Sequence, residues 1–245
     1  MRIGFRSILT AALLLSAAPA QAMTFFGEDV GAFPGPYTNS NLAQADFLAM
    51  LVTPGTEDFH AFDYPDTAPL ALSFRNPPGA LGTEIATGTL TDPTGDGFIA
   101  TAMIAKTGFP ISGPSYWKNE TDEDAGLFSV AFDAPERGFG FYATGYSTLS
   151  GADGTQLVLD LELQAGGTAS FVIPHSTAFT LGNAFYFGVI TDPFVRATLR
   201  NQGDDDGDVI GFDDFSVGNA VVPEPASDAL LAGGLLALAA SRRRR

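Results

Sequence analysis

Short runs in which apolar and polar residues alternate fill most of this chain, and glycine and proline separate them. Residues 157–163 are the cleanest run, because the leucines share one face while Asp160 and Glu162 lie on the other. A period of two is that of a β-strand with one buried face. Similar patterns predict further strands at 70–74, 84–91, 98–105, 128–132, 139–143, 168–174, 184–191, 194–200 and 208–218.

One segment has the pattern of a helix. Residues 41–51 lack Gly and Pro and carry a broad apolar face that includes Phe47 and Leu51. We expect Ser40 or Asn41 to cap this helix, and the helix to plug one end of the sheet structure. The pattern as a whole predicts an all-β fold, an antiparallel β-sandwich with jelly-roll-like topology and one short helix.

Both ends of the chain differ from this pattern. Residues 1–22 have a basic start, an apolar core and an A-x-A site at Ala20–Ala22, which is typical of a secretory signal peptide. At the other end, Pro223 and Pro225 favour extended backbone and end the folded domain. We therefore expect a signal peptide over 1–22, one β-sandwich domain over 23–221 and a separate tail over 222–245.

The tail holds an apolar stretch and a basic end. Every residue from 229 to 240 is Ala, Leu or Gly, and this run of 12 is shorter than the ~17–25 residues that span a bilayer. Arg242, Arg243, Arg244 and Arg245 follow and favour a cytoplasmic end. A short hydrophobic helix of this kind suits transient retention at the inner membrane. The alternative is a permanent membrane anchor.

The tail resembles a known signal. Val222, Pro223, Glu224 and Pro225, the apolar run and the terminal arginines are similar to a PEP-CTERM sorting signal, which exosortase reads in Gram-negative bacteria. The resemblance implies cleavage near the Pro-Glu-Pro box, then release or attachment at the cell surface. Expected partners are exosortase, the secretion machinery and extracellular polysaccharide.

The net charge and the absence of cysteine exclude several classes of partner and site. Removing both ends leaves 6 basic against 26 acidic residues, a net charge near −20 compared with −16 for the whole chain. Such a surface excludes nucleic acid as a partner. The chain has no cysteine, so cysteine nucleophiles and thiolate metal sites are excluded.

The body of the chain also resembles a known type. Residues 25–29, 39–41, 139–142 and 211–215 are similar to a recurrent PEP-CTERM ectodomain, which is itself similar to lectin-like or carbohydrate-binding sandwiches. This resemblance implies a fold and a location, and it supplies no catalytic residue.

An acidic segment near the C-terminus is a candidate cation site. Residues 201–214 contain six aspartates, and Asp204, Asp206, Asp208 and Asp213 are the candidate Ca²⁺ ligands. The spacing does not fit an EF-hand, which leaves a looser Ca²⁺ site or a solvated acidic turn. Asp213 and Asp214 also interrupt a strand, which requires either a β-bulge or a partner that holds a carboxylate inward.

Neither catalysis nor sugar binding has a strong motif. No G-x-S-x-G sequence occurs, and we expect His60 and His175 to be ordinary residues. Tyr116 and Trp117 lie in a polar segment, where an exposed pair would stack on a sugar ring and a folded-back pair would pack on the sandwich.

These observations predict an exported cell-surface or extracellular-matrix protein that is processed by exosortase and is structural or glycan-binding in an exopolysaccharide. We expect it not to be an enzyme, because no catalytic motif occurs. The alternative functions are a secreted glycan-active enzyme and a permanently anchored surface protein.

Overall fold

The computed structural model describes residues 22–101, 108–120, 126–146, 156–176, 180–202 and 209–220. Residues 1–21, the tail from 221 onward, and Asp204, Asp206 and Asp208 lie outside this part. The elements are β1 (Met23–Asp29), α1 (Thr38–Ala49), β2 (Gly55–Glu57), β3 (Leu70–Asn76), β4 (Thr83–Thr91), β5 (Phe98–Ala100), β6 (Tyr116–Glu120), β7 (Gly126–Thr144), β8 (Gln156–Leu163), β9 (Thr168–Val172), β10 (Ala184–Gln202) and β11 (Val209–Gly218).

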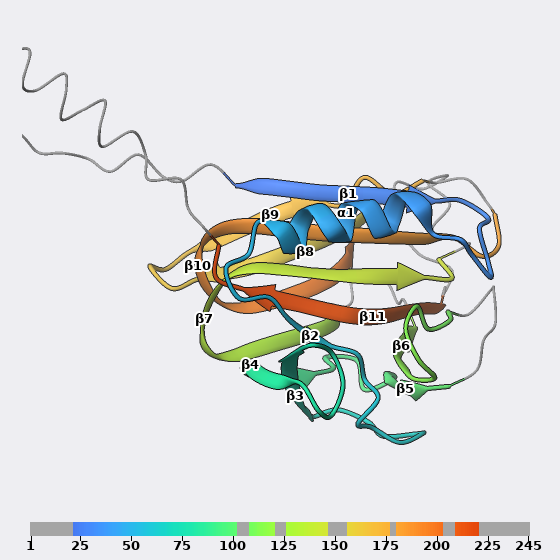
Figure 1. The fold of residues 1–245 in the computed structure, drawn as a ribbon, viewed down its shortest axis with the longest axis horizontal. Coiled ribbons are helices and arrows are strands. Elements are labelled where there is room, and N and C mark those ends of the chain that lie inside the picture. The colour runs from blue at the N-terminus through green and yellow to red at the C-terminus, as the bar shows by residue number, and fades with distance from the viewer. Residues whose placement is uncertain are drawn as a thin grey trace, which may run out of the picture. The chain divides into compact units, whose positions relative to one another are not determined.

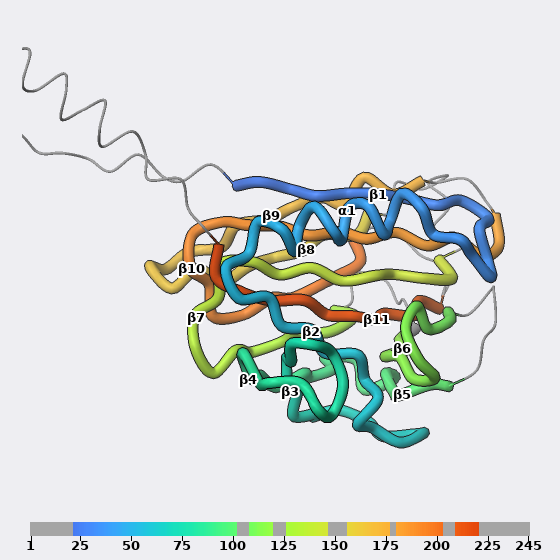
Figure 2. The backbone as a smooth tube through the Cα atoms, in the orientation of Figure 1, coloured from blue at the N-terminus to red at the C-terminus, as the bar shows by residue number. Residues whose placement is uncertain are grey.

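Two long, bent strands organise the sheet. Residues 138–144 of β7 pair with 184–190 of β10, and residues 126–131 of β7 pair with 196–200 of β10, with breaks in register between the two blocks. The first block also joins β1 and β11, whereas the second joins β4 and β8. Figures 1 and 2 show β7 and β10 turning from one block into the other. Each of these strands therefore belongs to two layers.

Phenylalanine rings fill the space between the layers. Phe128 on one half of β7 meets Phe141 on the other half at a centroid distance of 5.7 Å and an interplanar angle of 90°. Phe132 and Phe139 meet in the same way at 5.8 Å. Edge-to-face contacts of this kind add to the hydrophobic gain from burial. The strand thus folds back on its own aromatic residues, and the predicted antiparallel sandwich is confirmed.

The helix lies on a face of the sheet rather than at its end. α1 packs on β1 and β10, as Figure 1 shows, with Phe47 fully buried. A Cβ added at Gly188 would lie 2.8 Å from the Phe47 ring, so the glycine leaves room for the ring. The expectation that the helix plugs one end was wrong. Glycine leaves space on the outer face of the sheet, and the apolar side of α1 packs there.

The helix also begins earlier than predicted, and its cap comes from another element. The Asp29 carboxylate at the end of β1 accepts hydrogen bonds from the backbone amides of Asn39 at 3.0 Å and Ser40 at 2.9 Å. The Ser40 hydroxyl donates to the same carboxylate at 2.7 Å. A carboxylate at a helix start accepts hydrogen bonds from the free backbone amides and interacts favourably with the positive end of the helix dipole. Neither Ser40 nor Asn41 caps the helix through its own side chain.

The predicted strands are present, but the predicted strand 98–105 is described only as β5 (Phe98–Ala100), and three further strands were missed. The segments 128–132 and 139–143 prove to be one strand, β7, and 184–191 and 194–200 are both part of β10. No pattern predicted β1, β2 or β6. In the described part of the chain, no helix has the length and apolar character needed to cross a membrane.

Candidate functional site

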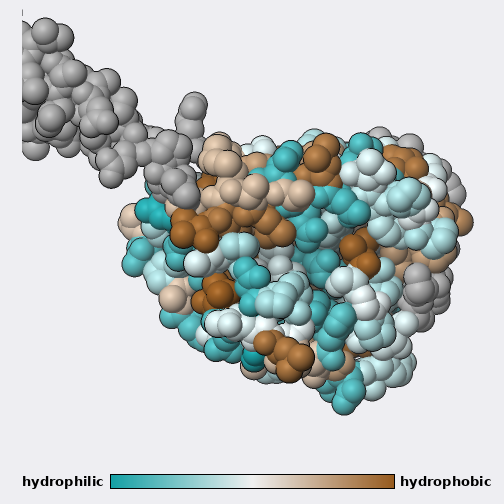
Figure 3. Space-filling view, in the orientation of Figure 1, coloured by the Kyte–Doolittle hydropathy of each residue, from teal (hydrophilic) through white to brown (hydrophobic). Residues whose placement is uncertain are grey.

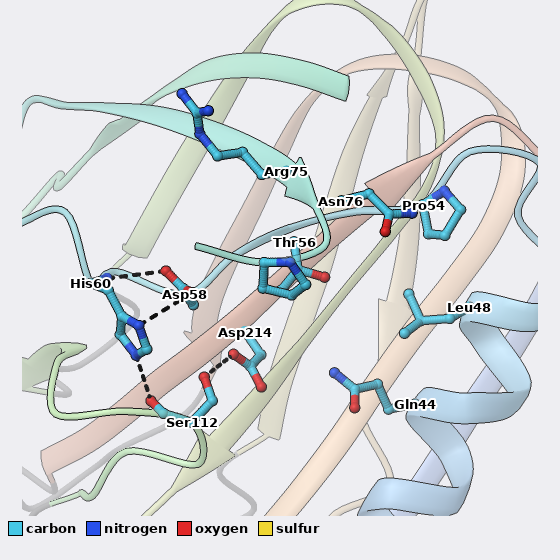
Figure 4. Close-up of a pocket in the computed structure, with 11 residues that line it drawn as sticks. Gln44, Leu48, Pro54, Thr56, Asp58, His60, Arg75, Asn76, Ser112 and Asp214 are labelled. Atoms are coloured by element: carbon cyan, nitrogen blue, oxygen red, sulfur yellow. Dashed lines mark hydrogen bonds and ion pairs between the residues drawn. The ribbon is translucent and has the colours of Figure 1, made fainter. Parts of the chain in front are cut away.

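A pocket of about 410 Å³ opens beside α1. Its walls come from α1, the chain around β2, the end of β3, the loop at Ser112 and the middle of β11, as Figure 4 shows. The lining residues are Gln44, Leu48, Pro54, Thr56, Asp58, His60, Arg75, Asn76, Pro78, Ser112 and Asp214. A second hollow of about 200 Å³ shares Thr56, Asp58, His60 and Arg75 with it. Apolar residues on this face form small separate patches among hydrophilic ones (Figure 3).

A β-bulge in β11 forms the floor of the pocket. Asp213 pairs with Tyr142 of β7 and Ser216 pairs with Gly140, so β11 advances three residues while β7 advances two. Asp214, inside this bulge, has φ of 48°, a left-handed conformation that is uncommon for a residue with a side chain. The β-bulge predicted from the alternating faces is confirmed, and it turns Asp214 toward the pocket.

Backbone amides hold the neighbouring Asp213 in the interior. Asp213 has no exposed surface, and its Oδ2 accepts hydrogen bonds from the amides of Ile111 at 2.7 Å and Ser112 at 3.0 Å. Its Oδ1 accepts from the amide of Asp214 at 2.8 Å. Burial and the charge of Asp214 nevertheless raise the pKa of Asp213 well above its ordinary value. Asp213 therefore fixes the Ser112 loop against β11.

Asp214 presents the other carboxylate of the bulge to the pocket. Its side chain is 8% exposed, and its Oδ1 accepts a hydrogen bond from the Ser112 hydroxyl. Burial raises the pKa of Asp214 to about 6, with a further rise from the charge of Asp58 and an opposing effect of His60. Asp214 is thus largely ionised at neutral pH and protonates in mild acid.

His60 bridges two walls of the pocket. Its Nδ1 lies 3.3 Å from Asp58 Oδ2, and its Nε2 lies 3.2 Å from the carbonyl oxygen of Ser112. Both ring nitrogens face acceptors, and only a protonated imidazole donates to both. A Cβ at Gly113 would lie 1.5 Å from Nε2, so the loop packs directly on the ring. His60 was expected to be an ordinary residue, and the structure places it in this wall.

Hydrogen bonds to the Glu57 side chain hold the segment before His60 in place. The buried Glu57 accepts hydrogen bonds from the amides of Phe59 and Ser73, each at 2.8 Å. Phe59 has φ of 56° and packs edge-to-face on Phe215 at 5.1 Å. Phe59 and Asp214 are the positive-φ residues other than glycine in the described part of the chain, and both adjoin the pocket. Such conformations require surrounding structure to hold them, and they gather at functional sites.

The aromatic pair predicted as a sugar platform is elsewhere and is buried. Tyr116 is 1% exposed and Trp117 has no exposed surface. Trp117 packs in the main core, whereas Tyr116, on the other face of β6, lies against Gly108 and Gly211 and donates its hydroxyl hydrogen bond to the Gly108 carbonyl oxygen at 3.0 Å. A Cβ at Gly97 would lie 2.0 Å from Trp117 Cζ2, so the β5 end covers the indole. The exposed arrangement is therefore wrong, and the alternative that folds the pair onto the sandwich is the observed one.

Only Asp213 of the four candidate Ca²⁺ ligands lies in the part of the chain that the structure describes. Asp204, Asp206 and Asp208 lie outside the described residues, whereas Asp213 is buried and hydrogen-bonded to backbone amides. Within the described ranges, no group of three or more His, Asp or Glu side chains is placed to hold a metal ion. Asp213 thus has the structural role of a carboxylate held inward by backbone amides, which is one of the two alternatives that the strand pattern left open. A Ca²⁺ site on the remaining three aspartates stays a prediction.

Sequence patterns gave only part of this site. The switch of faces at Asp213 and Asp214 located the bulge, and a carboxylate held by backbone amides was one of the two explanations considered. Asp58 and His60 carried no signal, since they meet Ser112 and Asp214 only through long-range pairing of β2 with β11. The residue that joins them, Ser112, lies in a loop with no motif.

Comparison with known proteins locates the sorting signal. Residues 221–245 match the PEP-CTERM protein-sorting motif. This motif indicates export and exosortase-mediated placement at the cell surface or outside the cell, as the sequence predicted. Comparison with curated proteins finds no match.

Some solved structures have similar arrangements of strands. One is a galactotriose complex of TmCBM61, at 14% identity over 53% of this chain and 86% of that chain, with a TM-score of 0.34. Another is the K2 cleaved adhesin domain of Lys-gingipain, at 9% identity over 67% of this chain and 99% of that chain, with a TM-score of 0.39. A third is Clostridium thermocellum Xyn10B CBM22-1–GH10 with xylohexaose, at 13% identity over 53% of this chain and 26% of that chain, with a TM-score of 0.31. Similarity at this level does not bear on the ligand of this chain.

Proposed function

We propose that this exported protein is a component of the cell surface or the extracellular matrix that binds polysaccharide in the pocket beside α1. The observation that carries the proposal is the lining itself. Carboxylate, amide and hydroxyl groups of Asp214, Asn76 and Thr56 face the same space as the apolar Leu48 and Pro54. Sugars present hydroxyl groups at their edges and C–H groups on their faces, and this lining can contact both.

The pocket has the size and rigidity that such binding needs. Its volume of about 410 Å³ lies within the ~300–1,000 Å³ typical of small-ligand sites. The Asp213 hydrogen bonds hold the Ser112 loop, and the Glu57 hydrogen bonds hold the segment before His60. A site that is already ordered loses less conformational entropy on binding. This favours recognition of one or two sugar units within a longer polymer.

Binding to immobilised glycans tests the proposal. The mature protein, purified from producing cells, is applied to a glycan array and to the producer's own exopolysaccharide, with and without Ca²⁺. We expect binding that falls about tenfold in Asn76→Ala, because this side chain lines the pocket and is exposed. Glu162→Gln, an exposed change on β8, is the matched control. Absence of binding to every glycan, with and without Ca²⁺, would overturn the proposal.

The two carboxylates of the pocket favour a second candidate function, a secreted glycan-active enzyme. Glycoside hydrolysis uses one carboxyl as a general acid and a second as a base or nucleophile. Asp214 has a pKa raised to about 6, and Asp58 shares the pocket with it. The test is incubation with exopolysaccharide, scored by release of reducing ends. Release that Asp214→Asn abolishes supports the enzyme, whereas binding without release supports the matrix protein.

A further inference from the structure

Negative charge dominates the inner wall of the pocket. Asp58 and Asp214 line it, whereas burial raises the pKa values of the adjacent Glu57 and Asp213 and disfavours their charged forms. Of the two basic side chains in the lining, His60 is a cation only when protonated, and its Nδ1 already lies 3.3 Å from Asp58 Oδ2. The electrostatic balance therefore disfavours ligands with carboxylate, sulfate or phosphate groups.

The other basic side chain, Arg75, is directed away from the pocket. Its Nη1 donates to the carbonyl oxygen of Gly82 at 3.0 Å, and its Nη2 lies 3.6 Å from Glu84 Oε2. Figure 4 shows the guanidinium pointing out of the space between Asp58 and Asp214. Arg75 therefore contributes its stem to the lining, and its charge is engaged elsewhere.

One carboxylate oxygen in this wall has no protein donor. Asp58 Oδ1 accepts from the His60 amide at 3.2 Å, and Asp58 Oδ2 faces the His60 ring. Asp214 Oδ1 accepts from the Ser112 hydroxyl, whereas no donor within the described residues reaches Asp214 Oδ2. The Asp214 side chain is more than nine-tenths buried and faces the pocket (Figure 4). Asp214 Oδ2 is not among the fully buried polar atoms that lack a partner in the described residues, so it is open to the pocket and can accept a hydrogen bond from a ligand there.

We propose that this oxygen binds an ammonium group, so that the preferred ligand is a polysaccharide with unacetylated amino sugars. The proposal rests on the proposed saccharide-binding function and adds the chemical class of the sugar. A charge-assisted N–H···O bond to Asp214 is stronger than a bond between neutral groups. A metal ion fits less well, because no group of three or more His, Asp or Glu side chains in the described ranges is placed to hold one.

Asn is the matched substitution for Asp214. It is among the few residues with a side chain that tolerate the left-handed conformation found here, with φ of 48°. Its amide oxygen still accepts the Ser112 hydroxyl bond, and an uncharged NH2 group of similar size replaces the pocket-facing Oδ2. Asp214→Asn therefore separates the charge from the shape of the pocket, and a thermal melt checks that the variant remains folded.

The test compares defined oligosaccharides at pH 7, where Asp214 is largely ionised. The probes are a chitosan oligosaccharide with free amines, its fully N-acetylated counterpart and an oligouronate, titrated against the mature protein. We expect the free-amine probe to bind about tenfold or more tightly than the N-acetylated probe, and the oligouronate to bind least. In Asp214→Asn this preference falls to about twofold or less, with N-acetyl binding nearly unchanged, whereas Glu162→Gln keeps the preference.

The outcomes separate the two proposals. Equal or tighter binding of the N-acetylated probe overturns the amine proposal and leaves saccharide binding intact. Binding of none of the probes, together with no binding on the glycan array, overturns both. A lysine-rich peptide that binds as tightly as the free-amine probe and loses affinity in Asp214→Asn would show recognition of amines without recognition of sugar, and would overturn the assignment to a polysaccharide.

Discussion

The buried carboxylate of Asp213 accepts a hydrogen bond from the backbone amide of Ser112 at 3.0 Å, across 101 residues of chain. The same oxygen accepts from the Ile111 amide at 2.7 Å. A single side chain on β11 thereby fixes a loop without regular secondary structure as a wall of the pocket. The next residue, Asp214, meets the Ser112 side chain. Asp213 thus holds the wall of the pocket, and the adjacent Asp214 faces the pocket.

Removing the Asp213 carboxylate should destabilise the fold. In Asp213→Ala the amides of Ile111, Ser112 and Asp214 lose their acceptor in a buried place, and we expect the free energy of unfolding to fall by about 2–4 kcal/mol. Urea denaturation measures the change. Asp46→Ala, at an exposed position of α1, should alter stability by no more than about 0.5 kcal/mol. A loss of the same small size in Asp213→Ala would mean that water replaces the carboxylate.

Stability should also fall as the pH rises from about 4.5 to 7, and Glu136 is the clearest source. Glu136 is 5% exposed, and burial raises its pKa from 4.5 to about 7. Because the folded pKa lies above the unfolded value, the folded state binds more protons across this interval. The resulting stabilisation is complete below about 4.5 and is lost as the pH rises through 7.

The matched variant isolates this group. Glu136→Gln cannot ionise, so its stability should depend less on pH, and at pH 8 it should exceed that of the native protein by on the order of 2–3 kcal/mol. Asp214 and Glu57 have pKa values raised in the same direction and remain in both proteins. The difference between the two proteins in how the free energy of unfolding depends on pH therefore reports the ionisation of Glu136. Parallel curves from pH 4.5 to 8 would refute the assignment to Glu136.

The sequence predicted the fold better than the site, for a physical reason. A strand with one buried face repeats every two residues, so β8 could be read directly from its leucines. The pocket depends instead on contacts between distant segments, such as His60 with Ser112, which leave no periodic signal. Trp117 shows the same limit, because the short strand β6 lies in a polar segment without a clear alternating pattern. The bulge at Asp214 was predictable since it interrupts an otherwise regular pattern.

The burial of Trp117 gives an optical test of where ligands bind. Trp117 is the only tryptophan of the chain and has no exposed surface. We expect its fluorescence to be shielded from acrylamide in the native protein, to become quenchable in urea and to be unchanged by bound saccharide. Gly97→Ala should displace the indole, whose Cζ2 would lie 2.0 Å from the new Cβ, and should cost about 1–3 kcal/mol of stability. A fluorescence shift on saccharide binding would instead place the ligand near β6.

Calcium binding by the acidic segment has a separate test. We propose that Asp204, Asp206 and Asp208 bind Ca²⁺, because carboxylates around a glycine turn suit this ion. A bound ion stabilises the folded state by mass action, so Tm should fall by several degrees when EDTA is added. Asp206→Asn should abolish the difference, whereas Asp160→Asn, on β8, should keep it. Equal melting with and without EDTA would leave these residues as a solvated turn.

Processing of the tail decides between a released protein and a permanently anchored one. We expect the wild-type protein from producing cells to have a C-terminus near Pro225, without Arg242–Arg245, by intact-protein mass spectrometry. Replacing Pro223 and Pro225 together by Ala should keep the full tail and shift the protein to the membrane fraction, because the extended strip that exosortase reads is lost. Asp228→Asn changes the tail outside the box and should be processed normally. A wild-type protein that is found in the membrane fraction with its arginines intact would favour permanent anchoring. In that case the 12-residue apolar run would retain the chain although it is shorter than the ~17 residues usually required to span a bilayer.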